Sequence, residues 1–581
     1  MKASQLFLIY FLLVCSVAGQ SLRQALIQEI ESGQISQTEA LFTEAVRRYA
    51  PEMLPEAYRS FADTPVKCGF GLDARIRHYW RAFSSQQQDL LSHILFRPDL
   101  PLEYVSHSQL FKIHYDTTGY NAVSTEDWNH SGVPDFVEEA AEAADRSYDI
   151  EVVRLGFQAP PDDRGVNGPE WDVYIRDMSG YYGMTYTDQQ ISRNPDVYTS
   201  YMELDNDYMQ TSTKGIDGLR VTVAHEFFHM IQLGYNGRDD NNDGDFDDLF
   251  LMEAGSTWME DVVYDHINDY LNYLPSFFNS TNRSLDVIDT RREYGLSVLF
   301  HFLEKRTGGR SFANTLWEDI VGYPALQALD RSLGRLGYLF EDELVLFYGW
   351  NATTGPQADT SLFYPEGDTY PNVRLDGSFL FSKDTTLTGE VAATGARYYR
   401  FASDNDLALT LVPVHTAWSG THDVKEFSLS LIHGTHPAPY TTVTPGVQAR
   451  LIAENETIWG GVAVLGTNGL AIDLVMLDGS QPGFDPDDLP ASYPNPFIPA
   501  NHAQLTIPFR NETAGVVNLL VTDASGHLVR EDRQLLESAG LHTFRWDGRN
   551  HNGELVPSGV YVYAVTTRDG IIRRDKLAVV R

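Results

Sequence analysis

Cysteine is nearly absent from this sequence. Of 581 residues only two are cysteines, and the first, Cys15, lies in the apolar N-terminal stretch. Cys68 then has no partner, which excludes an internal disulfide from the rest of the chain. We therefore expect hydrophobic cores and bound ions to stabilise the protein.

Basic residues are scarce as well. The 43 Lys and Arg residues stand against 80 Asp and Glu residues, which gives a formal net charge of −37. Such a surface repels nucleic acid and anionic membranes, and it attracts divalent cations. The composition therefore argues against nucleic acid as a partner.

Long apolar runs are missing beyond the N-terminus. The opening MKASQLFLIYFLLVCSVAGQ combines Lys2, an apolar run over residues 6–14 and small residues before Gln20. That run is too short to cross a bilayer as a mature helix, and the pattern is typical of a cleaved signal peptide over residues 1–19. No later segment has the roughly 18 unbroken apolar residues of a spanning helix. The sequence predicts an exported, soluble protein.

The hydrophobic pattern divides the chain into several domains. Residues 20–103 carry apolar residues at helical spacing and predict a helical N-terminal segment, about the size of a protease pro-region. Short strands such as FKIHYDTTG and DVYIRDM, followed by amphipathic helices, predict an α+β domain over residues 104–352. Alternating segments such as ARYYRFA and FSLSLIH predict a β-sandwich over residues 370–480, and a linker rich in Asp and Pro leads to an all-β unit over residues 490–581.

The segment VTVAHEFFHMIQLGYNG carries the clearest chemistry. His225 and His229 are four residues apart, so on a helix both can direct an imidazole nitrogen at one metal ion. Glu226 lies one position round the helix, where its carboxylate can act on water beside the metal. The alternative is that the two histidines bind no metal and only lie on the polar face of an amphipathic helix. The pattern favours a zinc site with an open position for water.

A third zinc ligand has to come from elsewhere in the chain. The metzincin pattern fails, because Gln232 and Tyr235 stand where it requires glycine and histidine. The gluzincin pattern survives, because LFLMEAGSTWMED supplies Glu253 on the next predicted helix. Glu260 is the alternative ligand, or a partner that orients a histidine.

AHEFFHMIQLGYN and MEAGSTWMED together resemble exported bacterial zinc metalloproteases of the gluzincin type, over about residues 110–350. The resemblance implies a thermolysin-like zincin fold, with His225, His229 and Glu253 as zinc ligands and Glu226 as general base. It also implies a secreted endopeptidase that acts on proteins or peptides. The spacing to Glu253 is longer than in well-studied gluzincins.

An oxyanion stabiliser is also needed for peptide hydrolysis. Tyr294, in RREYGLSV, is the candidate because it begins a predicted helix after the third ligand, and Tyr235 is the second choice. A buried structural tyrosine is the alternative for both.

Two acidic segments resemble calcium loops of twelve residues. In DWNHSGVPDFVE, Gly132 takes the sharp turn, and calcium would be bound by Asp127, Asn129, Ser131, Asp135 and Glu138. Pro134 replaces the usual apolar residue and no helix is predicted before the loop, so we expect an isolated structural site. An acidic turn without an ion is the alternative.

The second acidic segment, DDNNDGDFDD, lies between the two zinc-ligand helices. It offers calcium the side chains of Asp239, Asn241, Asp243 and Asp245. Its twelfth position is Phe250, which cannot bind an ion, so a solvated loop is the alternative. A bound calcium ion would fix the spacing of the zinc ligands.

Cys68 precedes the predicted catalytic domain in TPVKCGFGL. Its thiolate would suit the open position of zinc, as in the pro-segment of matrix metalloproteases. The rest of that motif is absent, which favours an incidental small residue.

The C-terminal stretch carries YPNPFIP and WDGRNHNGELVPSGVYVYAV, and it ends DKLAVVR. These are strands joined by Asn and Gly turns, with Trp546 as the expected core anchor. The set resembles the immunoglobulin-like sorting domains of the type IX secretion system and the related flagellar hook-capping fold. The resemblance implies passage through the outer-membrane secretion machinery of a Gram-negative bacterium to the cell surface or the medium. An accessory β-domain is the alternative.

Two further functions stay open at this point. A binding protein could keep the zincin fold and use its β-sandwich on a surface or polymer, although the presence of Glu226 and both histidines favours an enzyme. A peptidase restricted to glycosylated or otherwise special proteins also fits the sequence.

Overall fold

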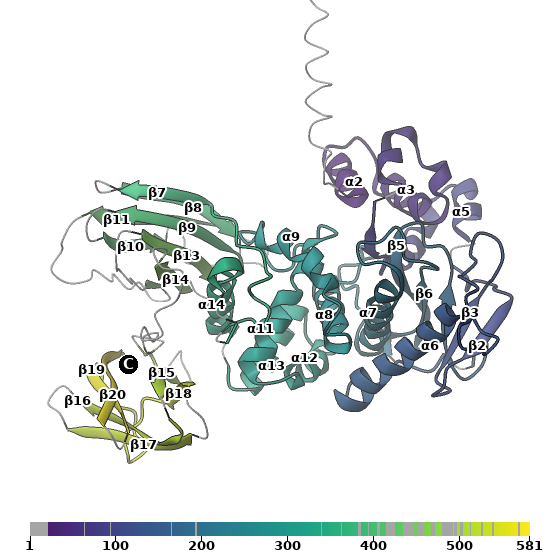
Figure 1. The fold of residues 1–581 in the computed structure, drawn as a ribbon. Helices are drawn as coiled ribbons and strands as arrows, with labels where there is room; N and C mark the ends of the chain where they lie inside the picture. Colours follow the sequence, from purple (N-terminus) through teal and green to yellow (C-terminus); the bar gives the residue numbers. More distant parts are fainter. Residues whose placement is uncertain are drawn as a thin grey trace, which may run out of the picture. The chain divides into compact units, whose positions relative to one another are not determined.

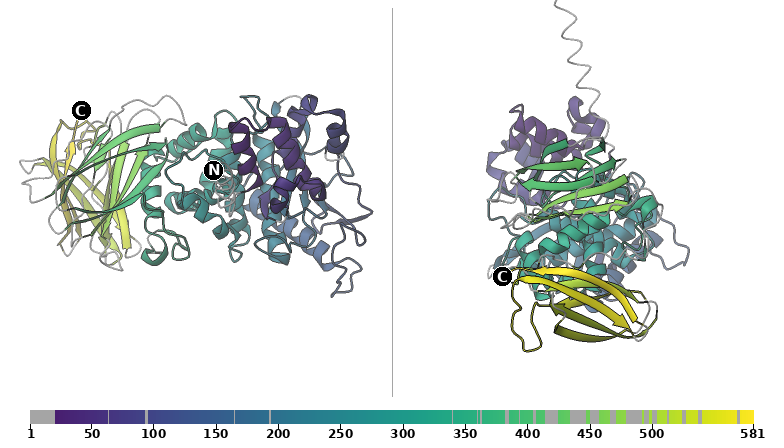
Figure 2. Two further views of the ribbon diagram at one scale, coloured as in Figure 1. Left: turned by 90° about the horizontal axis from the view of Figure 1, so that it is seen from above. Right: turned by 90° about the vertical axis from the view of Figure 1, so that its left-hand side faces the viewer.

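The computed structural model describes residues 21–581 with gaps, of which the longer are 414–423, 434–446, 450–456, 466–470 and 479–491. The predicted signal peptide, residues 1–19, lies outside the described residues. The chain divides into two compact units, Met1–Ser480 and Gln481–Arg581. Helices and one mixed sheet come first along the chain, and strands dominate after α14 (Figures 1 and 2). The protein is therefore multidomain, with an α+β part followed by β parts.

A mixed sheet of six strands forms the frame of the α+β part. Its order is β1-β5-β6-β4-β3-β2, with β1 at Val66–Cys68, β2 at Leu102–Val105, β3 at Phe111–Tyr115, β4 at Trp171–Ile175, β5 at Tyr181–Ile191 and β6 at Asn194–Leu204. β5 runs antiparallel to β6, and β1 pairs with β5 in parallel. The short strand β1 thus covers the edge of β5.

Helix α7 (Gly215–Tyr235) packs against this sheet beside α6 (Asp135–Tyr148). Phe227 of α7 contacts Phe111 of β3 and Trp171 of β4, with ring centroids 5.4 and 6.3 Å apart. Nearly every residue of α7 is buried, including His225, Glu226 and His229. Because a buried polar side chain is costly without a partner, each of these three must be matched inside the core.

The helices after α7 form the second layer of this part. They are α8 (Leu249–Val263), α9 (Leu274–Phe278), α10 (Arg292–Gly295), α11 (Ser297–Thr307), α12 (Ser311–Ile320), α13 (Ala325–Arg335) and α14 (Phe340–Asn351). α11 ends at Gly308, whose φ of 77° is the left-handed conformation that glycine adopts most easily. No described helix has both the length and the apolar character that crossing a membrane requires.

The N-terminal segment contains α2 (Leu22–Glu31), α3 (Gln37–Tyr49), α4 (Leu72–His78) and α5 (Ser85–Ser92). α2 and α3 each begin with a capping box, in which Ser21 pairs with Gln24 and Ser36 with Glu39. The sequence pattern predicts helices alone here, whereas the structure adds β1 to the central sheet. Three residues are too few to show an alternating pattern, so this strand has no local signal.

The remaining strands form two β parts. Sheets β10-β11-β8 and β12-β14-β13-β9-β7 lie in the first unit, with β7 at Gly377–Phe381, β8 at Thr385–Ala392, β9 at Ala396–Ser403, β10 at Leu407–Pro413, β11 at Val424–His433, β12 at Val447–Ala449, β13 at Thr457–Leu465 and β14 at Ala471–Asp478. Sheets β15-β18 and β17-β16-β19-β20 form the second unit, with β15 at Leu505–Asn511, β16 at Gly515–Asp523, β17 at Leu528–Leu536, β18 at Gly540–Trp546, β19 at Gly559–Thr567 and β20 at Gly570–Val579. Trp546 is buried in the core of this second unit, and its indole N–H donates to Arg549 O at 2.9 Å.

Candidate metal centre

Four buried side chains from three distant segments meet at one point. They are Cys68 of β1, His225 and His229 of α7, and Glu253 of α8, and one ligand atom of each lies within 4.8 Å of the others. His225 Nε2 is 3.1 Å from both Glu253 Oε2 and His229 Nε2, and the last two atoms are 3.3 Å apart. Ligands about 2.0–2.1 Å from a tetrahedral zinc ion lie about 3.3 Å from one another. The spacing therefore fits zinc.

Hydrogen bonds behind the two imidazoles fix their orientation. His225 Nδ1 lies 2.7 Å from Glu260 Oε1, and His229 Nδ1 lies 2.7 Å from Gln232 Oε1. Gln232 donates its amide N–H to Met252 O at 2.9 Å, so its oxygen is the acceptor that faces His229. The Ser256 hydroxyl also donates to this oxygen, at 3.4 Å. Both Nε2 atoms consequently face Glu253. Glu260 occupies the orienting position, the second of the two roles that the sequence left open.

The protonation of the two histidines suits a metal. Burial lowers the pKa of both His225 and His229 to about 3, so both imidazoles are neutral at pH 7. With Nδ1 of His229 donating, its Nε2 presents a lone pair to the carboxylate of Glu253. Facing lone pairs repel each other unless a cation lies between them. The donor set therefore fits a divalent metal ion.

Glu226 lies beside these ligands on the same helix. Its Oε2 accepts a hydrogen bond of 2.8 Å from the hydroxyl of Thr185 on β5, while its buried Oε1 has no hydrogen-bond partner among the described residues. Burial raises the pKa of Glu226 to about 8. A carboxyl group whose pKa lies near neutrality, with one oxygen held by Thr185, is arranged to accept and return a proton. No sequence motif marks Thr185.

Glycine at position 183 lets β5 approach α7 closely. A Cβ atom there would lie 2.6 Å from Thr222 Cγ2 and 2.9 Å from Glu226 Cγ, so a larger residue would displace the helix. The close approach brings Thr185, two residues further along β5, within reach of the Glu226 carboxylate.

Of the two tyrosines that the sequence proposed, only Tyr294 lies beside the centre. Its ring centroid is 6.2 Å from that of His225, and burial raises its pKa well above the usual value, so the phenol keeps its proton and can donate. Tyr235 instead accepts a hydrogen bond of 3.0 Å from Gln158 N and lies near Trp317. Its hydroxyl is already occupied there.

Residues next to Cys68 also enter the centre. The Phe70 ring stacks on the imidazole of His229, with centroids 4.0 Å apart and planes 9° apart. The buried ammonium group of Lys67 lies 2.8 Å from Glu260 Oε2 and also contacts Asp269. No local sequence pattern marks Lys67 or Phe70 as part of the centre.

The two proposed calcium loops share one backbone pattern. The side chain of the first aspartate, Asp127 or Asp239, accepts from the backbone N–H groups four and five positions later. In the first loop the Asn129 amide donates to Glu138 at 2.7 Å, and Trp128 N donates to Asp135. These contacts gather the predicted calcium ligands of the first loop, Ser131 included, around one turn before α6.

In the second loop the predicted calcium ligands already contact other groups of the protein. Asn241 accepts from Asp243 N at 2.9 Å, and Asp243 accepts from Asp245 N at 2.9 Å. The Asp245 carboxylate, however, lies 2.8 Å from the guanidinium of Arg23 and 3.3 Å from that of Arg75. The N-terminal segment thus neutralises the charge of Asp245.

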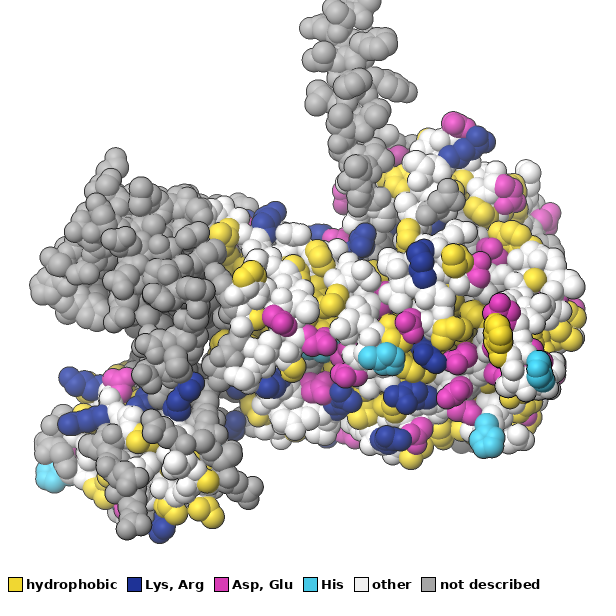
Figure 3. Space-filling view, viewed as in Figure 1, with side chains coloured by type: hydrophobic (Ala, Val, Ile, Leu, Met, Phe, Trp, Pro, Cys, Tyr) yellow, Lys and Arg dark blue, Asp and Glu magenta, His cyan; other side chains and the backbone are white. Residues whose placement is uncertain are grey.

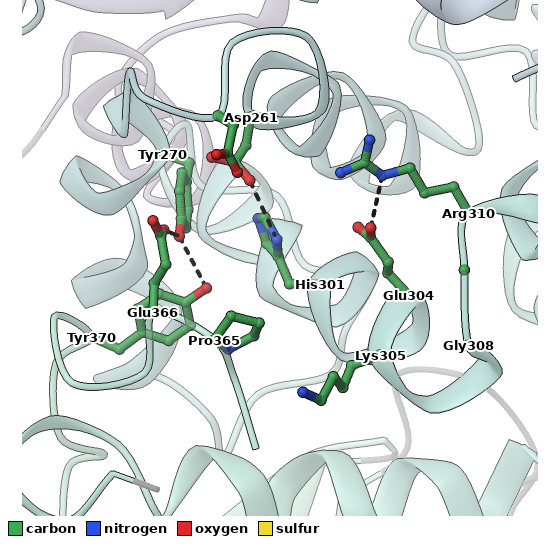
Figure 4. A pocket seen from close by; sticks show the side chains of 12 residues that line it. Asp261, Tyr270, His301, Glu304, Lys305, Gly308, Arg310, Pro365, Glu366 and Tyr370 are labelled. Atoms are coloured by element: carbon green, nitrogen blue, oxygen red, sulfur yellow. Dashed lines mark hydrogen bonds and ion pairs between the residues drawn. The ribbon is translucent and has the colours of Figure 1, made fainter. Parts of the chain in front are cut away.

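A separate pocket of about 360 Å³ lies among α8, α11 and residues 365–370 (Figure 4). Tyr270 donates a hydrogen bond of 2.5 Å to Glu366, and Asp261 lies 3.9 Å from His301. Burial raises the pKa of Asp261 to about 8. None of the four side chains of the candidate metal centre lines this pocket.

On the face in Figure 3, Lys and Arg side chains are scattered among Asp and Glu.

One family model matches the C-terminal part of the chain. Residues 503–570 match the FlgD Ig-like domain family. Over 68 residues the chain is 40% identical to the basal-body rod modification protein FlgD of Salmonella typhimurium, and it spans 29% of that protein and 11% of its own length. The family match and the strands of the second unit confirm the predicted immunoglobulin-like tail.

Solved structures give short matches too. The chain is 27% identical to PorZ, a surface component of the type-IX secretion system of Porphyromonas gingivalis, over 16% of this chain and 11% of PorZ, with a TM-score of 0.12. It is 29% identical to FlgD from Xanthomonas campestris over 13% of this chain and 55% of that one, with a TM-score of 0.11. Each match covers a small part of this chain.

Proposed function

We propose that this chain is a secreted zinc-dependent endopeptidase. The observation that supports it is the convergence of His225 Nε2, His229 Nε2 and Glu253 Oε2 at tetrahedral spacing. These three side chains would hold the ion, and Glu226 lies next to them with one carboxyl oxygen held by Thr185. These are the ligands and the base that the resemblance to gluzincin-type metalloproteases implies.

Each residue of the centre would have a separate role in peptide hydrolysis. A zinc ion bound here would polarise a water molecule and the peptide carbonyl. Glu226 Oε1 takes a proton from the attacking water and later gives it to the leaving amine, while Thr185 holds Oε2 in place. Tyr294 donates a hydrogen bond to the oxygen that becomes negative.

Mass spectrometry of new N-termini tests this function. Unfolded protein mixtures are incubated with the zinc-loaded chain and with its Glu226→Gln variant, both after limited proteolysis of the N-terminal segment. The wild type is expected to create new termini, and the variant to lose about 10²-fold or more of that rate while it keeps its zinc. Equal numbers of new termini from both would refute the role of Glu226, and none from either would favour a binding protein or a peptidase of narrow specificity.

We also propose that the immunoglobulin-like tail directs export by a type IX secretion system. Its support is the FlgD Ig-like match over residues 503–570 together with the predicted signal peptide. Deletion of residues 481–581 should retain the protein in the periplasm of a host that has this system. Unchanged export would identify the tail as an accessory domain.

Calcium is the second cofactor that we propose, at the loop of residues 127–138. The contacts of Asp127, Asn129 and Glu138 already gather oxygen atoms around one turn. Calcium should raise the thermal unfolding midpoint of the wild type, because an ion that binds only the folded state stabilises it. Asp127→Asn should lose this shift and Asp217→Asn, at an exposed position on α7, should keep it. An identical midpoint with calcium and with chelator in the wild type would exclude the site.

A further inference from the structure

The side chain of Cys68 enters the candidate metal centre from the N-terminal segment. Its sulfur belongs to the group that His225, His229 and Glu253 form, and all four residues are buried. A catalytic zinc site needs an open position, whereas four protein ligands close it. Cys68, His225, His229 and Glu253 together would therefore fill all four positions around a tetrahedral zinc ion.

Strand pairing determines where this thiol lies. β1 pairs with the edge of β5 in a register that sets Val66 opposite Tyr181 and Cys68 opposite Gly183. Gly69 N donates to Gly183 O at 3.2 Å, and Gly183 packs directly against the stem of Glu226. β1 also occupies the backbone hydrogen-bonding groups at the edge of β5. An extended substrate peptide would need these groups to pair with that strand.

The residues on either side of Cys68 hold it at this place. Phe70 N donates to the Cys68 sulfur at 3.3 Å, and its ring covers His229. Lys67 is buried between Glu260 and Asp269, so it pairs with the carboxylate that orients His225. An incidental small residue would need none of these contacts.

More distant ion pairs fasten the same segment to the catalytic part. Arg48 of α3 pairs with Glu203 of β6 at 2.9 Å, and both side chains are at most 2% exposed. Arg23 of α2 pairs with Asp245. Separating a buried ion pair leaves an uncompensated buried charge, so these pairs oppose the release of the segment that carries β1.

We propose that Cys68 is the fourth ligand of the metal and that the segment of residues 21–92 keeps the chain latent. This inference rests on the proposed zinc centre. Release of β1 withdraws the sulfur, opens the fourth position and exposes the edge of β5. The regulated step is thus removal of the segment, by cleavage between α5 and β2.

Zinc-edge X-ray absorption of the intact chain of residues 21–581 tests the ligand. We expect one sulfur at about 2.3 Å and three nitrogen or oxygen ligands at about 2.0–2.2 Å. Cys68→Ser should lose the sulfur, and Arg59→Ala, whose side chain is 62% exposed on the same segment, should keep it. A shell of nitrogen and oxygen alone in the wild type overturns the inference, whether or not the serine variant folds.

Peptide cleavage separates this inference from the proposed function. Intact wild type should be inactive, intact Cys68→Ser should cleave protein, and the further change Glu226→Gln should abolish that cleavage. A sulfur ligand without cleavage by any form would support the ligand and refute the peptidase. Cleavage by segment-free wild type without a sulfur ligand would support the peptidase and refute latency.

Discussion

Each imidazole of the candidate centre is fixed by a hydrogen bond on the side away from the metal. Glu260 lies behind His225 and Gln232 lies behind His229, both at 2.7 Å. Such partners set the tautomer and the ring orientation, and their loss typically lowers metal affinity about 10–100-fold. The affinity of the centre therefore depends on residues that do not touch the ion.

Replacing Gln232 by methionine tests this dependence. Gln232→Met keeps the size of the side chain but removes the nearer partner of His229 Nδ1, at 2.7 Å, and leaves the Ser256 hydroxyl at 3.2 Å. Zinc affinity should therefore fall about 10–100-fold. Competition with a chromophoric chelator measures it. Gln86→Met, at an exposed position on α5, should leave the affinity unchanged. Equal affinity in both variants would show that Gln232 does not orient the histidine.

The sequence predicted best the site residues that lie close together in the chain. His225, Glu226 and His229 follow from helical periodicity alone, and Gln232, three residues after His229, shares the face of that histidine. Glu253 required the resemblance to a known family. For Cys68 the sequence favours an incidental residue, because the rest of the pro-segment motif is absent. Its place beside the centre depends on the pairing of β1 with β5, which no local pattern encodes.

At the scale of elements, the contact between β5 and α7 positions Glu226. The close approach requires glycine at 183, since any Cβ atom there meets Thr222 and Glu226. The strand segments that the sequence pattern indicated include β3 and β4 but not β5. Its alternation of Met184, Thr185, Tyr186 and Thr187 was the signal that could have revealed it.

Gly183→Ala should therefore disturb both stability and the centre. The added methyl group overpacks the contact, and we expect a loss of about 1–3 kcal/mol in the free energy of unfolding. Denaturant unfolding measures this loss. Gly322→Ala is the control, because a Cβ atom at 322 meets nothing within 4 Å. Equal stability of the two variants would contradict the tight packing of β5 on α7.

At the scale of the whole molecule, the chain combines two units that have separate hydrophobic cores. The candidate metal centre lies entirely within the first unit, and the FlgD Ig-like match lies entirely within the second. The β-rich C-terminal part was predictable, because the alternation of apolar and polar residues is a local feature of the sequence. The pairing of β1, in the N-terminal segment, with β5 of the central sheet was not predictable from the sequence.

Separate cores predict separate unfolding. Trp546→Ala removes the largest side chain from the core of the second unit and should cost that unit about 3–5 kcal/mol, with zinc binding unchanged. Calorimetry should show one transition moved and the other unmoved. Val560→Ala, exposed on β19, should change neither by more than about 0.5 kcal/mol. A joint shift of both transitions would contradict independent units.

The central claim is that His225, His229 and Glu253 bind one zinc ion. Anomalous diffraction from crystals of the zinc-loaded chain, recorded on both sides of the zinc absorption edge, tests it most directly. The account predicts one strong peak about 2.0–2.2 Å from both Nε2 atoms and from a Glu253 oxygen. Zinc bound elsewhere, with this position empty, would contradict the account.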